Sequence, residues 1–161
     1  MNQPWKLTFD GKLANPRPIT MPVLQDLSKS SIDEIKYFSG NINYTTSFEL
    51  PAEDLRNDEL YLELGEVHSM AKVWVNDVYQ GGIWTPPYRV KLLPAAKAGR
   101  NTIRIEVVNT WVNRLIGDQT LPEGQGEIWT GINPYKSDSP LPKSGLLGPV
   151  KSVFYPIAQP E

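Results

Sequence analysis

The sequence predicts an all-β protein, an antiparallel β-sandwich of about eight strands. Two observations predict this fold class. Short runs of residues alternate between apolar and polar side chains with a period of two, which is typical of strands that bury one face. Most of the 15 prolines and 12 glycines fall between these runs, where a sandwich needs its turns.

The alternating runs occur along most of the chain, and the last covers residues 150–157. Each run places its apolar side chains on one face: Trp5, Leu7 and Phe9; Ile42, Tyr44, Phe48 and Leu50; Leu60, Leu62 and Leu64; Ala71, Val73 and Val75; Ile103, Ile105 and Val107. We expect the inward faces to pack between two sheets. Six side chains should be fully buried there: Leu62, Leu64, Val73, Val75, Ile103 and Ile105.

The clearest local signal lies in residues 70–88. A predicted strand ends at Val75 and is followed by Asn76 and Asp77, two residue types that tolerate positive φ angles. The return strand leads into a stiff loop in which Trp84 and Tyr88 flank two prolines. This pattern predicts a β-hairpin with a two-residue turn.

One short, peripheral helix is expected before the first long strand. Ser31 and Glu34 have the spacing of a capping box, and Ile32, Ile35 and Phe38 can pack inward. Two longer segments, residues 12–30 and 117–148, show no alternation. Inserts of this length in a compact domain are commonly functional or are docked against a neighbour.

The composition excludes several classes of function. The 161 residues suffice for one domain with a core, so residues 1–161 are predicted to form a single domain. A net charge of -2 gives no electrostatic reason to expect a nucleic acid or a membrane as partner. No apolar run is long enough to span a bilayer, and residues 1–10 lack the pattern of a signal peptide. Without cysteine, disulfides and thiolate metal sites are excluded.

Catalytic residues are not expected in this chain. His68 is the only histidine, so a serine triad or a zinc site lacks partners. Glycoside hydrolysis needs two facing carboxyl groups, and only Asp118, Glu123 and Glu127 lie in an unusual loop. Because a loop of this length contains a few acids by composition alone, we predict no catalytic residue, no metal ligand and no cofactor.

Aromatic residues in the predicted loops are the candidates for a binding site. Indole faces stack on the C–H bonds of sugars, whose hydroxyls bind amide and charged groups. Large loop aromatics also plug the ends of sandwiches or dock on other domains. Six residues are expected to gather at one end or flank: Trp84, Tyr88, Trp111, Asn113, Arg114 and Trp129. The plugging or docking role is favoured for Trp111, and both roles stay open for Trp84 and Trp129.

Several motifs resemble the sugar-binding jelly-roll domain of family 2 glycoside hydrolases. The segment NYTTSFELP (43–51) resembles its opening strand, and AKVWVN (71–76) resembles its core, with Asp77 at a position that is usually Gly. GRNTIRIEV (99–107) resembles a later strand. NTWVNRLIGD (109–118) and SGLLGPV (144–150) are similar to the C-terminal jelly roll of rhamnosidase-type enzymes of glycoside hydrolase family 106.

The resemblance implies a galactose-binding domain-like jelly roll that serves as a non-catalytic, sugar-binding accessory domain of a larger multi-domain hydrolase. Its partners would be carbohydrate and the other domains of that hydrolase, which would be rhamnosidase- or galactosidase-like and act on plant-type or other complex polysaccharide. Such a parent would be secreted, periplasmic or on the surface of a bacterium. An autonomous carbohydrate-binding module is the alternative, and it would require an exposed platform of two or more rings. Domains of this kind often hold a structural calcium ion, but no motif here supports one.

Overall fold

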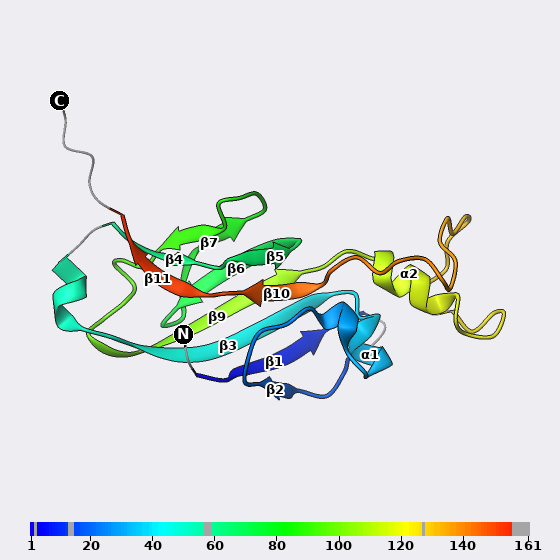
Figure 1. The fold of residues 1–161 in the computed structure, drawn as a ribbon, viewed down its shortest axis with the longest axis horizontal. Coiled ribbons are helices and arrows are strands. Elements are labelled where there is room, and N and C mark those ends of the chain that lie inside the picture. The colour runs from blue at the N-terminus through cyan, green and yellow to red at the C-terminus, as the bar shows by residue number, and fades with distance from the viewer. Residues whose placement is uncertain (2, 13–14, 57–58, 127, 156–161) are drawn as a thin grey trace, which may run out of the picture.

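The computed structural model describes residues 1, 3–12, 15–56, 59–126 and 128–155. Its larger layer is a six-stranded sheet in the order β2-β1-β3-β9-β6-β7 (Figure 1). The long strands β3 and β9 pair in register from Asn41↔Val108 to Leu50↔Gly99 and form the centre of this sheet. The six strands are β1 (Trp5–Asp10), β2 (Ile19–Met21), β3 (Asn41–Leu50), β6 (Met70–Val75), β7 (Val78–Ile83) and β9 (Gly99–Val108).

The second layer consists of shorter strands. A three-stranded sheet has the order β11-β4-β8, and a two-stranded sheet pairs β10 with β5. All pairings between named strands are antiparallel, which confirms the predicted fold class. These strands are β4 (Leu60–Glu63), β5 (Glu66–His68), β8 (Arg89–Lys91), β10 (Gly145–Gly148) and β11 (Lys151–Phe154). Residues 156 and 157 of the last predicted run lie outside the described residues.

The core lies between the two layers, where the inward faces of the strands meet. The six side chains predicted to be fully buried are all inaccessible to solvent, as the alternation requires: Leu62, Leu64, Val73, Val75, Ile103 and Ile105. Tyr44 is buried with them, and its hydroxyl accepts a hydrogen bond from the backbone N of Leu146 at 3.1 Å. Burial raises the pKa of this hydroxyl far above its usual value.

The predicted hairpin is confirmed. Val75 pairs with Val78, and the two residues between them, Asn76 and Asp77, have φ angles of 49° and 64°. The Asn76 side chain also ties the turn to the neighbouring strand, because its Oδ1 accepts from the backbone N of Thr102 at 3.0 Å and its Nδ2 donates to Oδ1 of Asn101 at 2.7 Å.

The helices differ from the prediction in three respects. Helix α1 (Asp33–Lys36) begins at Asp33 with Ile32 as N-cap, so Glu34 occupies the second helical position and the predicted capping box does not form. Ile35 and Phe38 are buried as expected, whereas Ile32 is 48% exposed, because it lies outside the first helical turn. A longer helix, α2 (Val112–Asp118), was not anticipated, and single 3₁₀ turns occupy η1 (Leu27–Lys29) and η2 (Ala52–Arg56). Among the described residues, no helix has the length and apolar character needed to cross a membrane.

Candidate functional site

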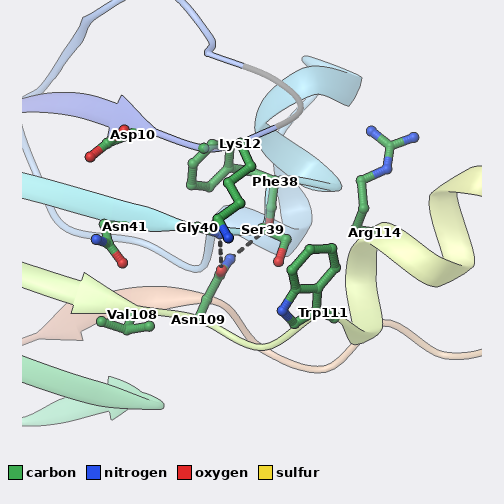
Figure 2. A pocket seen from close by; sticks show the side chains of 11 residues that line it. Asp10, Lys12, Phe38, Ser39, Gly40, Asn41, Val108, Asn109, Trp111 and Arg114 are labelled. Carbon is green, nitrogen blue, oxygen red and sulfur yellow. Dashed lines mark hydrogen bonds between the residues drawn. The ribbon is translucent and has the colours of Figure 1, made fainter. Parts of the chain in front are cut away.

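A pocket of about 440 Å³ opens at the end of the six-stranded sheet (Figure 2). Three strand ends bring its walls together, because Asn41 pairs with both Asp10 and Val108. The turn that precedes β3 and the start of α2 complete it. Its lining consists of Asp10, Gly11, Lys12, Phe38, Ser39, Gly40, Asn41, Val108, Asn109, Trp111 and Arg114.

Asn109 fixes the wall formed by residues 38–40. Its Oδ1 accepts from the backbone N of Gly40 at 2.8 Å, and its Nδ2 donates to the carbonyl of Phe38 at 2.6 Å (Figure 2). Gly40 has a φ of 148°, and a Cβ there would lie 2.6 Å from the carbonyl oxygen of Asp10. Glycine is therefore required for the close approach of this turn to β1.

The most exposed apolar group of the pocket is Trp111, the N-cap residue of α2, whose side chain is 49% exposed. Arg114, one turn further along the helix, also lines the pocket. Its guanidinium is engaged by Asp118, with Nε donating to Oδ1 at 2.8 Å. Arg114 thus stands in the wall of the pocket as part of an ion pair, and its predicted role in binding a sugar or docking a domain stays a prediction.

Polar groups that suit a sugar also line the pocket. Asp10 and Lys12 are exposed, and Ser39 and Asn41 are half-buried. An indole face for C–H stacking in one pocket with a carboxylate, an ammonium, a hydroxyl and an amide can bind a ring with several hydroxyl groups. Sequence reasoning missed these four residues because they are distant in the chain, and only the strand pairing places them together.

The other predicted site residues lie outside this pocket. Trp84, 69% exposed, lines a separate hollow with Pro86 and Pro87, and Tyr88 is half-buried with its carbonyl accepting from the backbone N of Leu64 at 2.8 Å. Trp84 still follows β7 at the same end of the sheet, because Ile83 pairs with Ala71 beside Val107.

Trp129 belongs to the segment that follows α2, and Asn113 lies within the first turn of α2. Trp129, 92% exposed, lines a third hollow together with Asp118. Asn113 is buried and donates from Nδ2 to the carbonyl of Pro142 at 2.9 Å. The structure therefore brings Trp111 and Arg114 into one pocket and distributes Trp84, Trp129 and the buried Asn113 among other places.

Charged groups elsewhere form local pairs. His68 lies 2.9 Å from Glu66, and Lys143 lies 2.7 Å from the same carboxylate. Hydrogen bonds from Lys143 and His68 hold the pKa of Glu66 below its usual value. Among the residues that the structure describes, no three His, Cys, Asp or Glu side chains are grouped to hold a metal ion.

Comparison with known proteins identifies glycoside hydrolases as relatives of this chain. No protein-family model matches the sequence. The chain is 32% identical, over 91% of its length, to a protein of Formosa agariphila named "Putative beta-glucuronidase", and it spans 15% of that protein.

Solved structures give the same result. The rhamnosidase of Novosphingobium sp. PP1Y matches 94% of this chain with a TM-score of 0.84 and 38% identity, over 14% of its own chain. The β-glucuronidase of Ruminococcus gnavus shares the fold over 68% of this chain, with a TM-score of 0.57 and 23% identity, over 21% of its own chain. In each hydrolase this chain corresponds to one domain within a much longer polypeptide.

Proposed function

We propose that this chain is a non-catalytic accessory domain of a multi-domain glycoside hydrolase, with the jelly-roll form found in family 106 rhamnosidase-type enzymes. One observation carries the proposal: 94% of this chain superposes on only 14% of the Novosphingobium rhamnosidase. Almost all of this chain therefore matches one compact part of a much longer enzyme, as expected for an accessory domain.

The pocket at Trp111 supports a carbohydrate-facing role for this domain. Its half-exposed indole stands beside polar groups from three strand ends, an arrangement suited to one sugar ring. A single ring on an open surface buries little of a ligand, so affinity in the isolated chain should be weak. In the parent, the pocket would contact polysaccharide at the rim of the active-site cleft.

The carboxylates support the assignment of catalysis to other domains. Asp10 is the single acidic residue among those that line the pocket. The Asp118 carboxylate accepts hydrogen bonds from Arg114 and from the backbone N of Ile128, so we assign it a structural role. Glu123 is exposed, and Glu127 lies outside the described residues.

The parent hydrolase is proposed to be bacterial and secreted, periplasmic or on the cell surface, since complex polysaccharides are extracellular substrates. Its other domains and carbohydrate are the proposed partners of this chain. The autonomous binding module is less favoured, because the exposed tryptophans Trp84, Trp111 and Trp129 line three different hollows and share no platform.

The proposal is tested by assaying the purified chain with aryl rhamnosides, galactosides and glucuronides. We expect no turnover above the buffer blank. Turnover that is abolished by Glu123→Gln, in a variant whose urea unfolding matches the wild type, would contradict the accessory role. In the parent hydrolase, Trp111→Ala should lower kcat/KM for polysaccharide and leave kcat/KM for an aryl glycoside unchanged, because only the long substrate reaches the accessory pocket.

A further inference from the structure

Residues 119–143, which lie between α2 and β10, are termed the α2–β10 arm. Figure 1 shows the arm extending with α2 beyond the ends of the strands. Among the described large hydrophobic residues, its Trp129 and Ile132 have the two highest exposed fractions, 92% and 84%. Apolar side chains this exposed on a projecting loop commonly mark a protein contact.

Residues 129–132 are termed the tip of the arm. Hydrogen bonds hold the chain on both sides of the tip. Before the tip, the backbone N of Ile128 donates to Oδ2 of Asp118 at 2.9 Å. After the tip, Nδ2 of Asn133 donates to the carbonyl of Leu115 at 2.9 Å. Residues 129–132 are therefore held as a short loop against α2, with Trp129 and Ile132 directed outward.

A pinned loop is suited to docking because little conformational entropy remains to be lost when its side chains are covered. Within the tip, the Thr130 hydroxyl donates to the carbonyl of Ile132 at 2.9 Å, which restricts the loop further. Polar bonds thus hold this backbone, while its largest apolar side chains contribute little to the core of the domain.

The matched hydrolases are long enough to supply a partner for the tip. The match to the rhamnosidase omits about 6% of this chain, fewer residues than the arm contains, so the shared structure reaches into the arm. That hydrolase has 86% of its length outside the matched region, since 14% of it is covered. Resting on the proposed function, we propose that Trp129 and Ile132 insert into an apolar hollow on another domain of the same hydrolase polypeptide.

The test is hydroxyl-radical footprinting of the full-length parent hydrolase and of this chain alone, with the oxidation of each tryptophan read by mass spectrometry. Trp5, which is buried in the core, is the negative control, because its oxidation should be slow in both proteins. A docked tip predicts that Trp129 is oxidised about tenfold more slowly in the parent than in the chain alone, because a docked anchor is desolvated. Equal oxidation rates in the two proteins would overturn docking and leave the accessory-domain proposal intact.

A pair of matched variants separates docking from folding. Trp129→Ser with Ile132→Ser should raise amide exchange of residues 119–143 in the parent about tenfold. The control, Trp84→Ser with Val23→Ser, removes an exposed tryptophan and an exposed β-branched side chain elsewhere and should leave that exchange unchanged.

Three further outcomes are decisive. Unchanged exchange in the Trp129→Ser, Ile132→Ser variant would overturn the inference. Protection of Trp129 in the chain alone that grows with concentration would overturn it too, because the occupant would then be a second copy. A parent gene that encodes no other domain would instead remove the proposed function itself.

Discussion

Arg114 and Asp118 form an ion pair that is more than nine-tenths buried, one turn apart on α2, with Nε of Arg114 donating to Oδ1 of Asp118 at 2.8 Å. The other oxygen of Asp118 accepts from the backbone N of Ile128 at 2.9 Å. One carboxylate therefore joins the wall of the Trp111 pocket to the α2–β10 arm. The two surfaces proposed to meet ligand and protein share this anchor.

Removal of one partner of this pair should be costly. Arg114→Leu leaves the Asp118 carboxylate buried without its cation, so we expect a loss of about 3–5 kcal/mol in the free energy of unfolding, measured by urea titration. The double variant Arg114→Leu, Asp118→Leu should cost no more than the single one, since no buried charge remains. A single variant that costs less than about 1 kcal/mol would show that solvent reaches the carboxylate.

The packing of α2 against Tyr37 should depend on the absence of a side chain at Gly117. A Cβ on Gly117 would lie 2.5 Å from Cγ of Tyr37, so Gly117→Ala should lower the free energy of unfolding by about 1–3 kcal/mol. Gly131→Ala is the matched control, because a Cβ there has no neighbour within 4 Å, and it should be neutral. Equal urea midpoints for the two variants would mean that α2 does not pack against Tyr37.

The hairpin makes a prediction about residue type at position 77. Asp77 has a φ of 64°, so Asp77→Gly should be neutral or mildly stabilising, whereas Asp77→Val should cost about 1 kcal/mol or more. Urea melts of the two variants provide the comparison. Indistinguishable stabilities would contradict a left-handed backbone at this turn.

A pH dependence follows from Asp26, whose Oδ1 accepts from the backbone N of Ser144 and from the backbone N of Ser28, each at 3.0 Å. Burial alone would raise the pKa of this carboxyl, but the bonds from Ser28 and Ser144 outweigh burial and hold the pKa below 3.8. A lowered folded-state pKa stabilises the fold above the unfolded-state pKa. This contribution disappears as pH falls through the folded-state pKa.

Asp26→Asn keeps an oxygen at the accepting position and does not titrate. The urea midpoint of the wild type should therefore fall more steeply than that of the variant between about pH 5 and pH 2.5. Other titrating carboxylates, such as Glu59 and Glu63, are common to both proteins and cancel in the difference. Parallel pH profiles would show that Asp26 is not linked to folding.

The strand faces and the Asn76-Asp77 hairpin could be predicted because their signals are local. Alternation reports burial directly, and each of the six expected core residues is buried. Helix α2 has no such signal. Of its five buried residues only Ile116 is a large apolar one, and the others are Asn113, Arg114, Gly117 and Asp118. Hydrophobic periodicity cannot detect a helix that buries polar groups and a glycine.

The pocket could not be predicted from the sequence, for a different reason. Asp10, Asn41 and Val108 meet only because β1, β3 and β9 are neighbours in the sheet, and sequence patterns do not give strand order. Trp111 is visible in the chain itself as a large aromatic next to polar residues, but the sequence favours a packing or docking role for it. The distinction between exposed Trp111 and buried Asn113, two residues apart, required the helix geometry.

Amide chemical shifts of the ¹⁵N-labelled chain would show whether this accessory domain has a sugar-facing pocket at Trp111. Titration with rhamnosyl and glucuronosyl oligosaccharides should give weak, saturable shifts, with a Kd on the order of 1 mM. The shifts should be confined to the pocket backbone, at Gly11, Ser39, Gly40, Asn41 and Asn109. They should be lost in Trp111→Ala and kept in Trp84→Ala. Absence of any shift at these amides, or binding that survives Trp111→Ala, would contradict the claim.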